Sequence, residues 1–440
     1  MAAKFSAKGA RMFGNAGLVL AARVSGALLT LLYTFLLTGV APPDEVGRAF
    51  TALSAGLLLS VVASLNVEAG SIRFLPLYFE KKREVDAAGF IIWCRRTVLV
   101  VCVTLVLPAA AFLFWWRGTE DVWPYLLALA AAPVVANARI NSRHAVAVGL
   151  VLSGTLPRIL VRPLLMTAVL GTGTLMGWEL TATEVMAAFL AASCLAAGLQ
   201  WILIRHAMAF RHGVTPRFAE ARDWTVLGLM LSPMLVMTEY MRNLIIIAAS
   251  LVLSAPDIAR LGISLSMISV LNFAVGALDM VFSPRISRAT AQDHPLERAR
   301  MLMLCGAGKL AGLAVGVPLA WLLIPVALGL MGGAYEGVEE MFLILALIPI
   351  SKAVFGPTSV VLNITGHKGV LLWVSVAGAA GLVVAVLVGE AIAGQNGATG
   401  GAALATVAYH GLLFAVCRSQ TGIDTTVLSL FWERRARQTG

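Results

Sequence analysis

Long uninterrupted runs of hydrophobic residues alternate with short polar segments along the 440-residue chain. Most runs are long enough to cross the ~30 Å hydrocarbon core of a bilayer as one helix. Lipid offers no hydrogen-bond partners, and the runs lack the short alternation of membrane β-strands, so they must be helices. We predict an all-α polytopic membrane protein of about twelve transmembrane helices. The predicted spans are Gly14–Leu37, Val46–Leu65, Thr97–Trp115, Val122–Ala138, Ile159–Met176, Val185–Ile204, Val226–Leu253, Leu261–Phe282, Met301–Leu330, Met341–Leu362, Val370–Val388 and Gly401–Cys417.

The loops between these spans differ sharply in their content of lysine and arginine. One set of alternating loops, which includes both chain ends, holds 24 of these residues, whereas the opposite set holds only Arg48, Arg117 and Arg260. Loops rich in lysine and arginine stay on the cytosolic side. We therefore expect a bacterial inner-membrane protein with both termini in the cytosol.

Composition excludes several other classes of protein. The chain is 59% hydrophobic and only 13% charged, too little charge to cover a soluble domain of this length. Its net charge of +10 comes from basic residues scattered between the spans, which argues against a nucleic-acid partner. The five cysteines and six histidines show no metal-binding spacing. No catalytic set and no phosphate-binding loop are present, so we expect no enzyme, no bound metal and no cofactor.

The longest polar connection, about His206–Trp224, divides the chain into two halves of six predicted helices each. We predict an N-terminal six-helix bundle over residues 1–210, and a C-terminal bundle with a short cytosolic tail over residues 211–440. The halves resemble one another in the order of their features, such as an acid near the cytosolic end of the second helix of each, Glu68 and Asp279. Such parallel repeats are related by an axis along the membrane normal.

Nine charged residues fall inside the predicted spans, where each centrally placed charge costs about 2.5–3.5 kcal/mol. They are Arg23, Arg73, Arg162, Arg242, Lys309, Lys352, Glu68, Glu239 and Asp279. Arg73 and Arg162 lie near the cytosolic face and can reach the lipid headgroups. The other charges have two interpretations, structural pairing or a water-filled cavity with surplus positive charge.

The cavity interpretation favours an anionic substrate, because arginine forks match phosphate oxygens. The candidate substrate-binding residues are Arg23, Arg242, Lys309 and Lys352. Buried acids are the usual sites of proton or sodium-ion coupling in transporters, so the candidate coupling residues are Glu239, Asp279 and Glu68. Glu239 and Arg242 are three residues apart on one predicted helix face. Protonation of Glu239 would release Arg242 to hold a pyrophosphate, or the two form a permanent structural pair.

Several stretches resemble the lipid-linked oligosaccharide flippases of the O-antigen translocase type. The stretches, in order along the chain, are Ala41–Gly47, Arg73–Phe79, Ser283–Ser287, Gly356–Lys368 and Gly397–Thr406. Gly356–Lys368 is similar to a family segment of the form GP…L…TGH, and Gly397–Thr406 to the opening of the family's last helix. That family belongs to the multidrug/oligosaccharidyl-lipid/polysaccharide exporter superfamily. Val46 departs from the family, which has an aromatic residue there.

The resemblance implies a MATE-like V-shaped fold of two six-helix bundles around a cavity that opens alternately to each side. It also implies export of an undecaprenyl-pyrophosphate-linked oligosaccharide for polysaccharide synthesis, with membrane lipids and a glycan polymerase among the partners and with H⁺ or Na⁺ coupling. A multidrug/cation antiporter shares this fold, although surplus positive charge disfavours its substrates. A lipid II flippase typically carries further helices. A glycosyltransferase would need a larger loop, and a non-transporting scaffold of a glycan assembly complex stays open.

Overall fold

A computed structural model describes residues 2–117, 122–206, 215–331 and 335–439. Throughout these ranges the regular secondary structure is helical, and no strand occurs. Nine of the described helices are long and apolar enough to cross a membrane, and a bent pair between Val338 and Ile364 makes a tenth. The chain is therefore an all-α, multi-pass membrane protein, as the hydrophobic pattern predicts.

The predicted count of about twelve spans is compatible with two further features of the described residues. Helix α17 (Lys368–Thr421) is a pair of helices joined at Ala393 and Gly394, whose backbone angles are not helical. Helices α10 (Ala221–Glu239) and α11 (Met241–Ala249) together cover the seventh predicted span, with a break at Tyr240. A hydropathy average does not locate such breaks, because a sharp turn inside an apolar run leaves the average hydrophobicity unchanged.

The chain divides into two compact units, Met1–Ser232 and Pro233–Gly440. The sequence prediction places its boundary at 210/211, which lies outside the described residues. The observed boundary falls inside α10 at Pro233, which lacks the backbone N–H that a helix interior needs. Residues that precede Pro233 join the first unit, because Arg217 donates its N–H to the carbonyl of Val85 at 3.1 Å.

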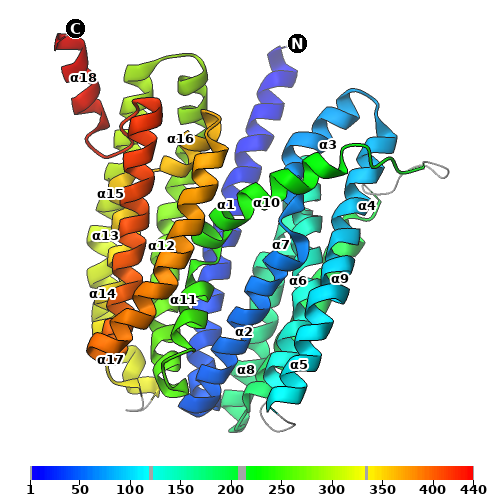
Figure 1. The fold of residues 1–440 in the computed structure, drawn as a ribbon, viewed down its shortest axis with the longest axis vertical. Helices are drawn as coiled ribbons and strands as arrows, with labels where there is room; N and C mark the ends of the chain where they lie inside the picture. Colours follow the sequence, from blue (N-terminus) through cyan, green and yellow to red (C-terminus); the bar gives the residue numbers. More distant parts are fainter. Residues whose placement is uncertain (1, 118–121, 207–214, 332–334, 440) are drawn as a thin grey trace. The chain divides into compact units, whose positions relative to one another are not determined.

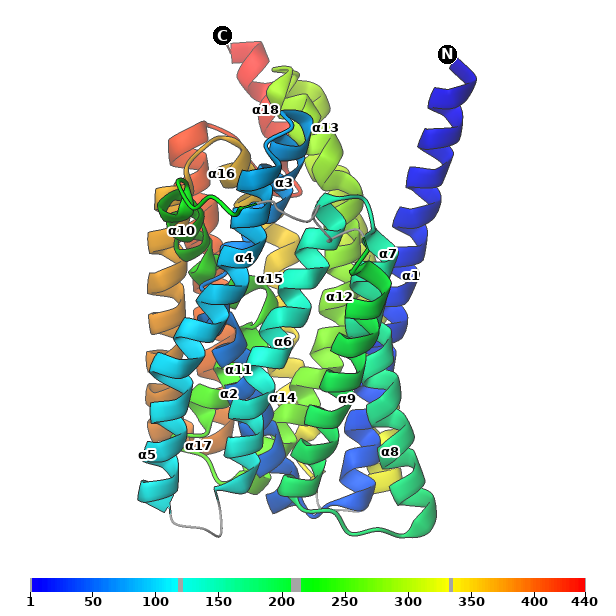
Figure 2. The same cartoon turned by 90° about the vertical axis from the view of Figure 1, so that its right-hand side faces the viewer.

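The first unit is built around α6, which packs against α2 on one side and α9 on another (Figure 1). Helix α1 runs beside α8 (Figure 2). An aromatic core of Phe74, Tyr78, Phe90 and Trp224 closes the end of the unit near α3 and α4. The elements are α1 Ala2–Val40, α2 Pro43–Ser64, η1 Val67–Gly70, α3 Ser71–Glu80, α4 Glu84–Val101, η2 Cys102–Val106, α5 Leu107–Arg117, α6 Trp123–Ala147, α7 Val151–Leu156, η3 Pro157–Val161, α8 Arg162–Met176 and α9 Ala182–Ile204.

The second unit is built around α12 and α13, which pack along one another, while α17 contacts α11, α14, α15 and α16. Beyond α11 its elements are α12 Ala255–Ala291, α13 Pro295–Met331, α14 Val338–Leu345, α15 Leu347–Phe355, α16 Thr358–Ile364, α17 and α18 Ser429–Thr439. Gly356 separates α15 from α16 with φ +73°, and a Cβ there would lie 2.0 Å from the carbonyl oxygen of Thr425. Only glycine suits this position.

The connection between α9 and α10 is held against the first unit. Glu220 accepts hydrogen bonds from the hydroxyl of Tyr78 and from Arg83 Nη2, the latter at 2.7 Å. Trp224, which is fully buried, donates its indole N–H to the Tyr78 oxygen at 2.9 Å. The hydrogen bond from Tyr78, followed by that from Arg83, lowers the pKa of Glu220, while burial is the main cause that raises the pKa of Tyr78.

Candidate functional site

Three of the predicted site residues meet inside the second unit. Asp279 projects from α12, Lys309 from α13 and Lys352 from α15. Lys309 Nζ lies 2.5 Å from one oxygen of the Asp279 carboxylate, and Lys352 Nζ lies 3.9 Å from the other. Two ammonium groups therefore share one carboxylate; we call these three residues the Asp279 cluster.

The two lysines of the Asp279 cluster differ in their surroundings. Lys309 is only 1% exposed and is held tightly, as a buried ammonium must be. Lys352 keeps 30% of its side-chain surface open and Asp279 keeps 18%. Asp279 lies 12 residues before the end of α12 and Lys309 lies 14 residues after the start of α13, or roughly 18 Å and 21 Å at about 1.5 Å per residue. Lys352 lies three residues before the end of the short helix α15. The cluster thus combines one fixed charge with one accessible charge at depth.

Further polar groups surround Lys352. Ser351 Oγ lies 2.8 Å from Nδ1 of His410 on α17, and the charges of Lys309 and Lys352 both act on that imidazole. Glu239, at the end of α10, acts electrostatically on Lys352. The structure thus places Glu239 and the Asp279 cluster in one electrostatic neighbourhood, which the sequence alone does not reveal.

Arg242 lies in the first turn of α11, directly after the break at Tyr240. Its Nη2 donates to Ser266 Oγ at 2.7 Å and to the Gly262 carbonyl at 3.3 Å, both on α12. The predicted continuous helix through these two residues is interrupted at Tyr240 (φ −118°, ψ 10°), so Glu239 ends α10 and Arg242 belongs to α11. Arg242 is therefore positioned by α12.

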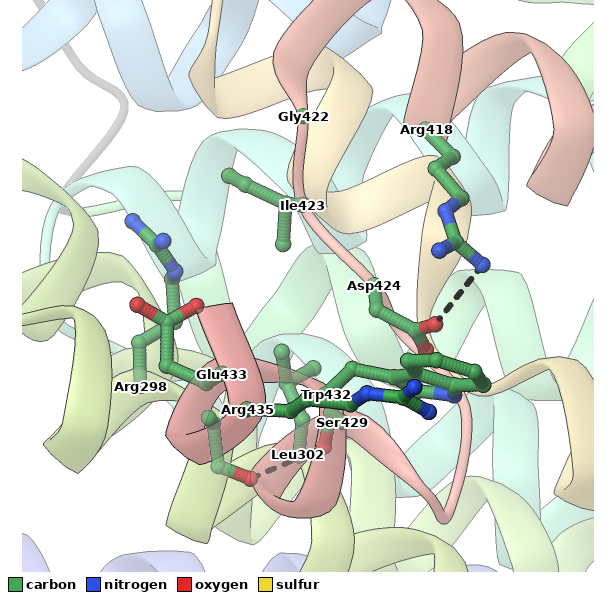
Figure 3. A pocket seen from close by; sticks show the side chains of 11 residues that line it. Arg298, Leu302, Arg418, Gly422, Ile423, Asp424, Ser429, Trp432, Glu433 and Arg435 are labelled. Carbon is green, nitrogen blue, oxygen red and sulfur yellow. Dashed lines mark hydrogen bonds and ion pairs between the residues drawn. The ribbon is translucent and has the colours of Figure 1, made fainter. Parts of the chain in front are cut away.

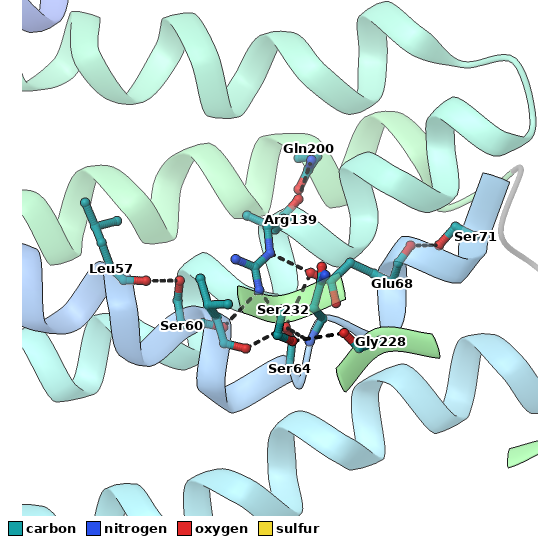
Figure 4. Close-up of polar contacts among 12 residues, drawn as sticks. Leu57, Ser60, Ser64, Glu68, Ser71, Arg139, Gln200, Gly228 and Ser232 are labelled. Carbon is teal, nitrogen blue, oxygen red and sulfur yellow. Dashed lines mark hydrogen bonds and ion pairs between the residues drawn. The ribbon is translucent and has the colours of Figure 1, made fainter. Parts of the chain in front are cut away.

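In the first unit, Glu68 forms a closed polar cluster instead (Figure 4). Its Oε1 accepts from Arg139 Nε at 2.6 Å, and Arg139 Nη2 donates to Ser64 Oγ at 2.5 Å and to the Ser60 carbonyl at 3.1 Å. Glu68 is fully buried and Arg139 is 2% exposed. This arrangement links the end of α2 to α6 and has the character of a structural ion pair.

Arg139 is one of the 24 cations assigned from the sequence to the cytosolic loops, and its assignment to a loop is wrong. Helix α6 continues to Ala147, nine residues beyond the predicted end at Ala138, and it carries Arg139 into the interior of the unit. The one sequence signal for the Glu68–Arg139 ion pair is that an acid ends the second predicted helix and a base follows the fourth. The contact between Ser351 and His410 was not predicted, because the two residues are 59 positions apart and no sequence motif links them.

Arg23, the remaining predicted substrate-binding residue, lies half-buried on α1 and belongs to the first unit. The two cations predicted to be structural make aromatic contacts. Arg73 lies over the ring of Phe74 and Arg162 over that of Phe189, with 5.4 Å and 5.2 Å between guanidinium carbon and ring centre. Such contacts stabilise a cation at a membrane interface.

No group of three or more metal-binding side chains is present in the part of the chain that the structure describes. Neither a protein-family model nor a curated protein matches the sequence. Solved structures do match the fold over nearly the whole chain.

One similar structure is the lipid II flippase MurJ in an inward closed conformation, with TM-score 0.69, 12% identity, and coverage of 96% of this chain and 93% of that one. A second is a multidrug resistance MATE family transporter of the MOP superfamily in its inward-facing conformation, with TM-score 0.62, 13% identity, and coverage of 90% and 94%. A third is a multidrug resistance MATE family transporter of the MOP superfamily in its outward-facing conformation, with TM-score 0.61, 13% identity, and coverage of 92% and 95%. The chain therefore has the helical membrane fold shared by MATE transporters and the MurJ flippase.

Proposed function

We propose that this protein is a membrane transporter that flips an undecaprenyl-pyrophosphate-linked oligosaccharide from the cytosolic to the periplasmic leaflet by alternating access. The observation that carries the proposal is the Asp279 cluster, in which two lysines share one carboxylate and Lys352 stays open. The likeness to MurJ and to MATE transporters supports a transporter or flippase within this fold. The glycan class rests on the motifs in Gly356–Lys368 and Gly397–Thr406.

A pyrophosphate suits this cluster electrostatically. Lys309 and Lys352 bring two positive charges to the single carboxylate of Asp279. Lys352 Nζ lies 3.9 Å from the Asp279 carboxylate, which is longer than a charged hydrogen bond. A phosphate oxygen can therefore replace the carboxylate oxygen as the partner of Lys352. Lys309 would stay on Asp279 and keep the site from collapsing. The prenyl chain needs no protein site, since it can remain in lipid.

Asp279 is the coupling residue in this proposal. Its carboxylate competes with the substrate anion for Lys352, so protonation of Asp279 and binding of the pyrophosphate favour each other. We assign Glu68 a structural role instead, because Arg139 and Ser64 already hold it. Glu239 adds a second negative charge that acts on Lys352.

The test is a flipping assay in proteoliposomes with a fluorescent prenyl-pyrophosphate-linked oligosaccharide. Wild type should expose the glycan to an added glycosidase, and Lys352→Gln should slow this by about tenfold or more, the value of one charge-assisted phosphate contact. Arg73→Gln is the matched control, because Arg73 is exposed on α3, and its rate should equal wild type. Export of a cationic dye without glycan flipping would show an antiporter, and movement of neither substrate would show a scaffold.

A further inference from the structure

A pocket of about 300 Å³ lies at the far end of the second unit from the α13–α14 connection, where α13 begins, α17 ends and α18 folds over both. Figure 3 shows the side chains around it. The charged and aromatic residues that line it are Arg298, Arg418, Asp424, Trp432, Glu433 and Arg435. It shares no residue with the Asp279 cluster.

The chain that forms this pocket is firmly attached. Thr425, fully buried, donates to the Phe355 carbonyl at 2.7 Å, and Ser429 donates to the Ala299 carbonyl at 2.9 Å. A Cβ on Gly306 would lie 2.7 Å from Cγ2 of Val427, so this loop lies tightly on α13. The pocket is therefore a fixed feature of the unit.

Arginine dominates the chemistry of the pocket. The guanidinium carbons of Arg418 and Arg435 lie 5.5 Å and 5.9 Å from the ring centre of Trp432. Asp424 accepts from Arg418 Nη1 at 3.3 Å and is also occupied by the backbone N–H and hydroxyl of Thr426, at 2.9 Å and 2.6 Å. The Asp424 contact uses one of the five N–H donors of Arg418.

Next to these charges, α18 and the residue directly before it expose large apolar side chains. Leu428 is 59% exposed and Phe431 is 58% exposed, while Trp432 is 37% exposed. Apolar and basic side chains on one short helix are typical of a helix that lies in the membrane interface. Helix α18 begins eight residues after α17 ends at Thr421, so these side chains follow closely on the end of the last span.

We propose that this pocket binds the phosphate of an anionic diacyl phospholipid in the leaflet at the arginine-rich face. Three guanidinium groups against two carboxylates favour an anion, and arginine forks match phosphate oxygens. The exposed Leu428 and Phe431 favour a lipid over a soluble phosphate, because they would contact the acyl chains. This proposal does not rest on the transported substrate.

The experiment measures lipid retention on the purified full-length protein by native mass spectrometry. Phosphatidylglycerol and phosphatidylcholine of equal acyl length serve as probes, and wild type should retain the anionic lipid preferentially. Arg298→Gln with Arg435→Gln should weaken that binding by about fivefold for each arginine. The control is Arg434→Gln, on the same helix but outside the pocket lining, which should bind like wild type.

Two further arms separate the sources of the phosphate. In the first arm, glycerol 1-phosphate is added as a soluble competitor of phosphatidylglycerol, and it should compete only weakly. Phe431→Ser should weaken phosphatidylglycerol binding but leave the binding of glycerol 1-phosphate unchanged. Equal retention of both lipids by wild type, or an equal loss in Arg434→Gln, would overturn the proposal. Glycerol 1-phosphate that binds as tightly as the lipid would show a soluble ligand and overturn the lipid assignment. Unfolding temperatures of every variant report whether the pocket is still folded.

Discussion

Single charged residues show which buried sites can be predicted from a hydropathy profile and which cannot. The sequence predicts that Asp279, Lys309 and Lys352 are charges inside apolar spans, where burial is costly without a partner, and the structure shows that the three are in contact. Arg139 is not predictable in this way, because its partner Glu68 is 71 residues distant and a hydropathy profile evaluates each residue without its neighbours in space. A charge at the end of an apolar run therefore looks like a loop residue until its partner is known.

The Glu68–Arg139 pair gives a stability prediction. Arg139→Met leaves the Glu68 carboxylate buried without its partner, and should destabilise the first unit by about 3 kcal/mol. Glu68→Gln combined with Arg139→Met removes both charges and should recover much of that loss. Thermal unfolding in detergent measures both, with Arg73→Gln as the exposed control. If the double variant is as unstable as the sum of the single variants, the pair is not coupled.

Helices and their breaks form the next scale. Glycine at 356 and 394 marks two breaks that composition can indicate, whereas the break at Tyr240 carries no sequence signal, since tyrosine is an ordinary residue in a helix. Close helix contacts are equally hidden. A Cβ on Gly397 would lie 1.9 Å from the carbonyl oxygen of Gly389, so the motif Gly397–Thr406 serves the packing of the two halves of α17.

The attachment of the α9–α10 connection gives a prediction for pH dependence. The lowered pKa of Glu220 means that its ionised form stabilises the fold. This contribution is fully present above the ordinary carboxyl pKa of about 4.3 and is lost as pH falls through the lowered value. Glu220→Gln should therefore lower the unfolding temperature at pH 7, and the difference from wild type should vanish at low pH. A difference that stays constant between these conditions would contradict the assignment.

At the scale of the whole molecule, both units contain an ion pair between corresponding spans. An acid of the second span meets a base of the fourth span in each unit: Glu68 with Arg139, and Asp279 with Lys352. The first unit buries this pair, whereas the second unit adds Lys309 and leaves the side chain of Lys352 partly exposed. The order of features along the sequence indicates the repeat, but only the structure shows which copy is open. The fold itself accommodates different substrates, so function must be argued from these side chains.

The most direct test of the Asp279 cluster as an anion site is the binding of a short-chain prenyl pyrophosphate to the purified protein at a fixed pH. We predict about tenfold weaker binding for Lys352→Gln, and binding at least as tight as wild type for Asp279→Asn, because the competing carboxylate is removed. The unfolding temperature of Asp279→Asn reports whether the fold tolerates a buried Lys309 without its charged partner. Unchanged affinity in Lys352→Gln, or weaker binding in a folded Asp279→Asn, would contradict the account.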